Sequence, residues 1–225
     1  IANVDGIPPT GAVALLRQDH QNLGRRLFAS HCSSCHLYNG HDGRGYPVED
    51  SPSAADLAGF GSVEWITRLL DYDHYVSDKY FGGTKFKDGT MARKVLAKYT
   101  EEEKALLPDI ALLLADGAKL PYEEPLDEEK REELLSLYYN DDLDFEDGRS
   151  CIECHDIDSE DEGSAPDLTG YASRDWLIEF IGNPEDDRFY GKKNDRMPCY
   201  ARDGKLKPEE IAILADWIRS NPAEF

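Results

Sequence analysis

The sequence predicts an all-α protein made of two tandem helical domains. With 225 residues, of which 40% are hydrophobic, the chain is long enough to bury one large core or two small ones. Strand-like alternation of polar and apolar residues is scarce, whereas helical patterns recur along the chain. The pattern Cys-x-x-Cys-His occurs twice, at residues 32–36 and 151–155, and this duplication favours two domains.

The predicted domain boundaries follow from a break in the helical pattern near the middle of the chain. A segment that contains Pro121 and Pro125 interrupts the pattern there. We therefore expect a first domain at 1–120 with an N-terminal extension at 1–19, a linker at 121–126, and a second domain at 127–225.

The first half is expected to contain three helical segments. An amphipathic run at 21–30 leads into the first Cys-x-x-Cys-His motif. Ser62 is a suitable N-cap for a helix at 63–70. A terminal helix begins after Thr100, where three glutamates complement the positive end of the helix dipole, and Pro108 should kink or restart it.

The second half repeats this order of helices. One helix is expected at 127–139, and Ser173 can cap another that continues to Ile181. Pro208 suits the first position of a terminal helix through Arg219, because an N–H at that position would have no helical partner.

A gapless repeat supports the duplication. Residues 53–65 align with residues 164–176, and seven of the thirteen positions are identical. Further along, residues 80–82 (Tyr-Phe-Gly) correspond to residues 189–191 (Phe-Tyr-Gly), and each is followed by a methionine. The two halves therefore look like copies of one unit.

The two Cys-x-x-Cys-His motifs predict two covalently bound haem c groups. Two thiols one helical turn apart can reach the two vinyl groups of one porphyrin, and the next imidazole then lies beneath the iron as proximal ligand. A zinc site would need Cys and His in groups of four, and a redox dithiol has no reason to place His after the second Cys twice. The attachment residues are Cys32, Cys35, Cys151 and Cys154, and the proximal ligands are His36 and His155.

Each half resembles class I cytochrome c, in which an N-terminal helix, a haem motif, a long loop, a ligand methionine and a C-terminal helix follow one another. The resemblance implies two tandem cytochrome c domains, each wrapped around one haem. It also implies that a loop carbonyl orients the proximal imidazole; Pro166 matches that position in the second half, and Ala55 stands there in the first. Other residues expected around the porphyrins are Leu57, Trp65, Tyr80, Phe81, Leu168, Trp176, Phe189, Tyr190 and Trp217.

The distal ligands that the resemblance implies are the two methionines, one in each half. Met197 precedes a proline, as in the family's ligand dipeptide, whereas Met91 does not. Thioether ligation favours ferrous iron and raises the potential relative to a second imidazole. His74 is a rival ligand for the first haem, and the unpaired Cys199 is a rival for the second; surface exposure or ordinary core packing is the alternative for each.

The charge is acidic and unevenly distributed. The net charge is −21; residues 1–122 carry 13 basic and 16 acidic side chains, whereas residues 123–225 carry 12 and 30. Nucleic acid and anionic lipid surfaces are therefore poor partners, and a basic redox protein is the electrostatic complement. The alternative is an acidic surface that only maintains solubility.

Membrane contact is expected only through a partner or through an anchor or larger membrane protein removed from this chain. The sequence has no run of eighteen or more apolar residues, and it begins at Ile1 without a leader pattern. Haem attachment by this motif resembles the extracytoplasmic route of bacteria, which implies the periplasm or an equivalent compartment.

Haem iron with six ligands has no open position for substrate, so the expected function is outer-sphere electron transfer rather than catalysis. Phrases around residues 80–91 and 189–198 resemble the diheme cytochrome c domains attached to cytochrome b in bacterial quinol–cytochrome c oxidoreductases. This resemblance implies a Rieske/cytochrome b complex as donor and a soluble, basic cytochrome or similar protein as acceptor. The alternatives are a free periplasmic diheme shuttle, a terminal-oxidase diheme subunit, or an enzyme of the thiosulfate dehydrogenase or peroxidase type.

Overall fold

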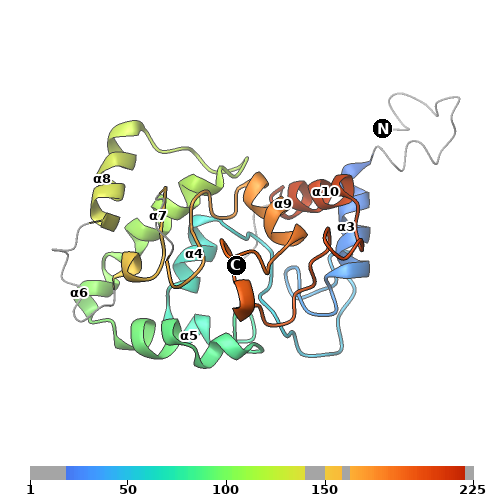
Figure 1. Ribbon diagram of the computed structural model, residues 1–225, viewed down its shortest axis with the longest axis horizontal. Helices are drawn as coiled ribbons and strands as arrows, with labels where there is room; N and C mark the ends of the chain where they lie inside the picture. Colours follow the sequence, from blue (N-terminus) through green and yellow to red (C-terminus); the bar gives the residue numbers. More distant parts are fainter. Residues whose placement is uncertain (1–18, 140–149, 159–162, 221–225) are drawn as a thin grey trace, which may run out of the picture.

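The computed structural model describes residues 19–139, 150–158 and 163–220 (Figure 1). These residues form helices and loops without a strand; isolated bridges occur around Tyr38, in the loop after the first motif. The predicted all-α class is therefore confirmed. Most of the extension expected at 1–19 lies outside the described residues.

Each predicted helix is present, and its ends lie within one residue of the expected positions. The α-helices are α3 (His20–His31), α4 (Val63–Leu69), α5 (Tyr72–Tyr75), α6 (Glu101–Lys104), α7 (Leu107–Ala118), α8 (Glu128–Tyr139), α9 (Arg174–Gly182) and α10 (Pro208–Ile218). Shorter helical turns are η1 (Lys85–Asp88), η2 (Met91–Val95), η3 (Leu96–Lys98), η4 (Cys151–Glu153) and η5 (Gly191–Lys193).

Helices α4 and α9 begin in the same way in the two halves. The Ser62 hydroxyl accepts a hydrogen bond from the backbone N–H of Trp65 at 3.1 Å, and the Ser173 hydroxyl accepts one from Trp176 at 3.2 Å. Each serine thereby satisfies one of the N–H groups that a helix start leaves without a partner. Both predicted N-caps are confirmed.

Pro108 restarts the terminal helix of the first half. Thr100 and Glu103 form a capping box at the start of α6, in which the nearly inaccessible Glu103 carboxylate accepts from the Thr100 N–H at 2.6 Å. Helix α6 ends at Lys104, and α7 begins at Leu107 with Pro108 in its first turn. A proline is tolerated there because the first-turn N–H groups have no helical acceptor.

The helices pack in two groups at opposite ends of the molecule. The most extensive contacts join α3 to α10, α4 to α7, and α9 to α10, and α7 also contacts α8. Figure 1 shows α7 and α8 at one end and α3 and α10 at the other. The pair α7 and α8 and the pair α3 and α10 each join a helix before residue 121 to a helix after residue 126.

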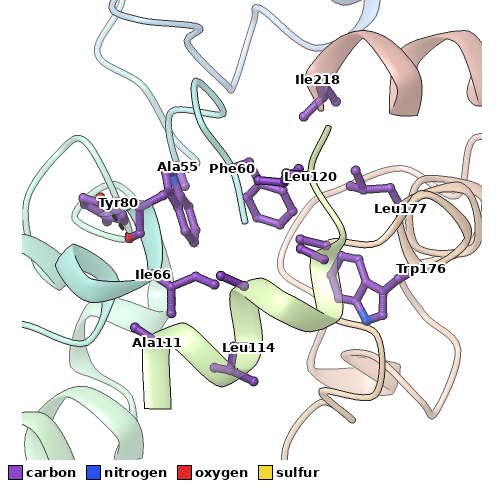
Figure 2. Close-up of a cluster of buried hydrophobic side chains, with 14 of the residues drawn as sticks. Ala55, Phe60, Ile66, Tyr80, Ala111, Leu114, Leu120, Trp176, Leu177 and Ile218 are labelled. Atoms are coloured by element: carbon purple, nitrogen blue, oxygen red, sulfur yellow. Dashed lines mark hydrogen bonds between the residues drawn. The ribbon is translucent and has the colours of Figure 1, made fainter. Parts of the chain in front are cut away.

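One hydrophobic core runs through the described residues. Figure 2 shows side chains from both halves, among them Ile66, Leu114, Trp176 and Leu177, gathered around Phe60. The Phe60 ring lies 4.8 Å from the Trp65 ring and 6.3 Å from the Trp176 ring, measured between centroids. Within the described ranges, no helix is both long and apolar enough to span a bilayer.

Candidate functional site

The first Cys-x-x-Cys-His motif forms a tight turn at the end of α3. The Cys32 N–H still donates to the Phe28 carbonyl at 2.8 Å, and the Cys32 carbonyl then accepts from Cys35 at 3.0 Å and from His36 at 2.8 Å. This turn brings the two cysteines close together and the imidazole directly after them. The arrangement is what attachment of one porphyrin through two thioethers requires.

The second motif forms the same turn. The Cys151 carbonyl accepts from Cys154 at 3.2 Å and from His155 at 2.9 Å, over the turn η4. The Tyr138 hydroxyl, from α8, donates to the His155 carbonyl at 2.8 Å. Helix α8 is thus linked to the second motif by a hydrogen bond to the backbone of its histidine.

Both imidazoles are oriented by a backbone carbonyl. His36 Nδ1 lies 2.7 Å from the Ala55 oxygen, and His155 Nδ1 lies 2.7 Å from the Pro166 oxygen. A carbonyl can only accept, so Nδ1 carries the proton and Nε2 keeps its lone pair for a metal. Burial lowers the pKa of both histidines, against the opposing effect of the carbonyl hydrogen bond, so both rings are neutral.

The loops that carry these carbonyls are fixed at equivalent positions. The Cys35 carbonyl accepts from Ala54, and the Cys154 carbonyl accepts from Ala165. The N–H groups of Leu57 and Leu168 each return to the segment just after their own motif, at 2.9 and 2.8 Å. The repeat found in the sequence therefore has a structural purpose: it presents one carbonyl to each imidazole.

The first cysteine of each motif lies in poorly solvated surroundings. Burial raises the pKa of the Cys32 thiol to about 12 and that of Cys151 to about 11, the latter in spite of a hydrogen bond from Tyr99. Such thiols stay uncharged. An uncharged thioether, the product of haem attachment, suits the same surroundings.

The two tryptophans of the repeat differ in their polar contacts. Trp65 is almost inaccessible, and its Nε1 donates to the Asp56 carbonyl at 3.0 Å. Trp176 is also buried and stacks on Phe180 with 4.9 Å between centroids, but its Nε1 has no hydrogen-bond partner among the described residues. The other expected pocket aromatics Tyr80 and Phe189 are buried as well, and Phe81 and Tyr190 pack against the same core.

The two methionines are half-buried in loops of different geometry. Met91 opens the π-helical turn η2, and such turns frequently mark functional positions. Met197 follows η5, and its carbonyl accepts from the Asn194 side-chain amide at 2.8 Å. That either sulfur ligates iron stays a prediction.

The two rival ligands lie in contrasting places. His74 is exposed on the short helix α5, and its Nδ1 lies 2.8 Å from the Asp71 carboxylate. Cys199 is 1% exposed, and burial raises the pKa of its thiol. The next residue, Tyr200, donates its N–H to the Ile181 carbonyl at the end of α9.

Three buried polar groups lie outside the motifs, and only one of them, on Trp217, belongs to a residue that the sequence predicted around a porphyrin. Tyr122 Oη, Trp217 Nε1 and Arg219 Nε are buried and have no hydrogen-bond partner within the described part of the chain. Donors of this kind fit the carboxylates of a porphyrin. Tyr122 stands in the predicted linker and Arg219 at the end of the terminal helix, and no motif marks either of them.

The comparisons with known proteins agree with this geometry in the C-terminal part of the chain. The cytochrome c family model matches residues 145–222, a range that holds the second motif, Pro166 and Met197. No curated protein and no solved structure matches the chain. Residues 145–222 are therefore similar to a cytochrome c domain, a family that carries covalent haem c and serves in electron transfer.

Proposed function

We propose that the protein is a diheme cytochrome c that transfers electrons by outer-sphere transfer. The main support is the geometry of the two imidazoles: His36 and His155 are partly buried, neutral and held by a carbonyl at the same distance of 2.7 Å. Their Nε2 atoms are thereby available as proximal ligands of two covalent haems.

Methionine ligation would complete each iron centre. With Met91 and Met197 as distal ligands, both irons are six-coordinate and have no position for substrate. Haem supplies one-electron redox chemistry when bound; the chain attaches it, orients the imidazole and excludes water with the aromatic core. Thioether ligands and apolar surroundings favour moderately high potentials.

The place of the protein in electron flow is between a membrane quinol-oxidising complex and a soluble acceptor. The support is the resemblance of the two methionine segments to diheme subunits of such complexes and the net charge of −21. The donor, a Rieske/cytochrome b complex, would face the basic residues near Met91, and a basic cytochrome would dock on the acidic surface. The compartment is the periplasm or its equivalent. The basic residues are Lys79, Lys85, Lys87, Arg93, Lys94 and Lys98.

The test is a redox titration of the purified holoprotein that follows each haem separately, with low-temperature EPR of the ferric state. Two low-spin His/Met centres of moderately high potential are expected. Recovery of the protein with a cytochrome b subunit after mild solubilisation would support the membrane complex over a free shuttle or a terminal-oxidase subunit.

A different spectrum would contradict the proposal. A thiolate-bound haem would implicate Cys199 and call for an assay of thiosulfate oxidation. A high-spin, five-coordinate haem would call for a peroxidase assay. Either result would make the protein an enzyme instead of a carrier.

A further inference from the structure

The terminal helix of the second half lies on the first motif. Helix α10 packs along α3, and the contact is so close at Gly24 that a Cβ there would lie 2.4 Å from the Trp217 Cβ. The Trp217 ring lies 5.2 Å from Phe28, at the end of α3, and 4.4 Å from Tyr38, in the loop after the motif. These aromatic contacts seat α10 on the N-terminal helix that carries Cys32.

The terminal helix of the first half lies instead on α8, beside the second motif. Asp116 on α7 pairs with Arg131 on α8 at 3.2 Å, and the same arginine reaches Asp158 after the second motif at 3.4 Å. Tyr138, on the same helix, donates to the His155 carbonyl. Helices α7 and α8 and the second motif therefore form one packed group.

The segment after each methionine also contacts the motif of the other half. Tyr200, three residues after Met197, donates its hydroxyl to the His31 carbonyl at 2.5 Å, next to Cys32. Three residues span about 10 Å at most, so Met197 stays near the first motif. Tyr99 hydrogen-bonds the Cys151 thiol, and the helical turns η2 and η3 between Met91 and Tyr99 keep that methionine near the second motif.

In each half, the chain passes from its haem motif to its tryptophan helix through the repeated segment. The two repeated segments meet at equivalent positions. Gly61 and Ala172 are counterparts in the alignment of 53–65 with 164–176, and both have positive φ, +84° and +59°. A Cβ at Gly61 would lie 2.4 Å from the Ala172 Cβ, so the Ala172 side chain packs directly on the Gly61 backbone. The preceding counterparts, Phe60 and Tyr171, lie 5.5 Å apart between ring centroids.

The exchanged unit in each half is the tryptophan helix together with the methionine and the terminal helix. Helix α4 packs on α7, and α9 packs on α10 through the paired contacts of Arg174 with Asp216 at 2.7 and 3.1 Å. Each unit stays tied to the loop it leaves, because the Asp56 N–H donates to Lys79 and the Asp167 N–H donates to Arg188. The crossing therefore lies inside a continuous core.

We infer that the two haem sites are interlaced, so that Met197 is the axial partner of the haem at Cys32 and Cys35, and Met91 that of the haem at Cys151 and Cys154. Each site takes its attachment motif from one half of the chain and its distal ligand from the other. This pairing rests on the proposed diheme function. It replaces two tandem domains with one lobe of residues 19–61 and 173–220 and another of the described residues between 62 and 172, which are 62–139, 150–158 and 163–172.

The direct test is a two-dimensional nuclear Overhauser experiment on the reduced holoprotein with methyl-labelled methionine. The porphyrin ring current displaces the methyl resonance of an axial methionine, and contacts through the porphyrin protons connect that methyl to the thioether protons of one motif. The signal that disappears in a Met91→Leu variant identifies the two methionines. We expect the Met197 methyl to connect to Cys32 and Cys35.

A pair of matched variants gives an independent answer. Cys151→Ser with Cys154→Ser leaves a single haem at the first motif. In that background, Met197→His should abolish the sulfur-to-iron charge-transfer band and replace the His/Met EPR spectrum with a bis-histidine spectrum. Met91→His should leave the charge-transfer band and the His/Met EPR spectrum unchanged. If the single-haem protein does not fold, the measurement on the unaltered chain decides.

The two proposals fail in different ways. Connections of each methionine to the motif of its own half, or the reverse behaviour of the two histidine variants, would overturn the interlaced pairing and leave the diheme carrier intact. A holoprotein in which neither haem has a methionine ligand would overturn both.

Discussion

The two proximal imidazoles are held alike although the residues behind them differ. Ala55 and Pro166 use only their carbonyl oxygens for this purpose, and a carbonyl is present whatever the side chain. The side chain instead decides how much freedom the loop loses on folding, since proline restricts φ in the unfolded chain as well.

Ala55→Pro should therefore be tolerated. The bond from His36 Nδ1 is retained, and the preceding alanine has the same hydrogen bond as Ala165 before Pro166. We expect a gain of about 0.4–1 kcal/mol in unfolding free energy with an unchanged haem potential. The matched control is Ala54→Pro, which removes the N–H that donates to Cys35 and should be destabilising by about 0.5–1.5 kcal/mol. Equal behaviour of the two variants in denaturant titrations would refute this account.

Asp42 organises the loop after the first motif. Its side chain is buried and accepts from the backbone N–H groups of Arg44 and Tyr46, and the Arg44 guanidinium pairs with it at 2.8 Å. Burial favours the neutral acid, but the hydrogen bonds and the guanidinium outweigh it and hold the pKa of Asp42 below its ordinary value.

The ionised Asp42 carboxylate should stabilise the fold at neutral pH. A depressed pKa means that this stability is present above the unfolded-state value, about 4, and is lost as the pH falls through the lower folded-state value. Asp42→Asn should thus unfold more easily at pH 7, and its deficit against the wild type should shrink below pH 4. The exposed Asp78→Asn serves as control. A deficit independent of pH would show that charge is not the cause.

Close approach of α3 and α10 depends on one small residue. Gly24 leaves no room for a side chain, because the nearest atom of Trp217 would lie 2.4 Å from an added Cβ. Glycine costs helix stability in isolation, so its presence in the middle of α3 is explained by packing and not by propensity.

Gly24→Ala should force the two helices apart and destabilise the protein by about 1–3 kcal/mol, as overpacking typically does. Gly117→Ala is the matched control, since it is also a helical glycine but its added Cβ would meet only Gly170, at 3.8 Å. There the better helix propensity of alanine should stabilise by up to about 1 kcal/mol. Thermal unfolding of the two variants measures the difference, and the same sign for both would contradict the packing argument.

Interlaced lobes make the molecule a single folding unit. Each lobe contains helices from both halves, and one core crosses the contact between Gly61 and Ala172. Each terminal helix is buried partly against a helix of the other half, α10 against α3 and α7 against α8.

Unfolding should consequently be one cooperative transition. The spectral changes of the two haems, followed separately in denaturant, should coincide with the loss of helical circular dichroism. Two tandem domains of unequal composition would give separate midpoints. A clear separation of the two haem transitions would therefore count against interlacing.

Net charge is concentrated on one lobe. Among the described residues, those between 62 and 172 carry 11 basic and 21 acidic side chains, whereas those of 19–61 and 173–220 carry 12 and 15. The exposed glutamates of α8, Glu128 and Glu132 among them, contribute to this field beside the second motif. A basic partner is attracted at long range, and salt screens that attraction.

The rate of electron transfer to a basic cytochrome should fall as ionic strength rises. Reversal of charge at Glu128 and Glu132 to Lys should lower the rate at low salt, whereas Glu209→Lys, exposed on the other lobe, should have a smaller effect. Stopped-flow kinetics measure both. A rate indifferent to salt and to these substitutions would leave the acidic surface with a role in solubility only.

Local chemistry in the sequence was sufficient to predict the helices and the core of each site. Ser62, Ser173 and Pro108 act through neighbours within one helical turn, and the Cys-x-x-Cys-His turn is equally local. The carbonyls that face His36 and His155 were predictable from the resemblance to class I cytochrome c. The repeat then aligns Ala55 with Pro166, although the two residues lie 19 and 11 positions after their imidazoles.

The tertiary structure alone decided which helix packs on which motif. Because the two halves are copies, either terminal helix offers a similar apolar face to either N-terminal helix, and no periodicity can distinguish the partners. The choice depends on contacts between residues far apart in the chain, such as Trp217 with Gly24 and Tyr200 with His31. Tertiary packing likewise buries the Tyr122 hydroxyl and the Arg219 Nε, for which the sequence carries no signal.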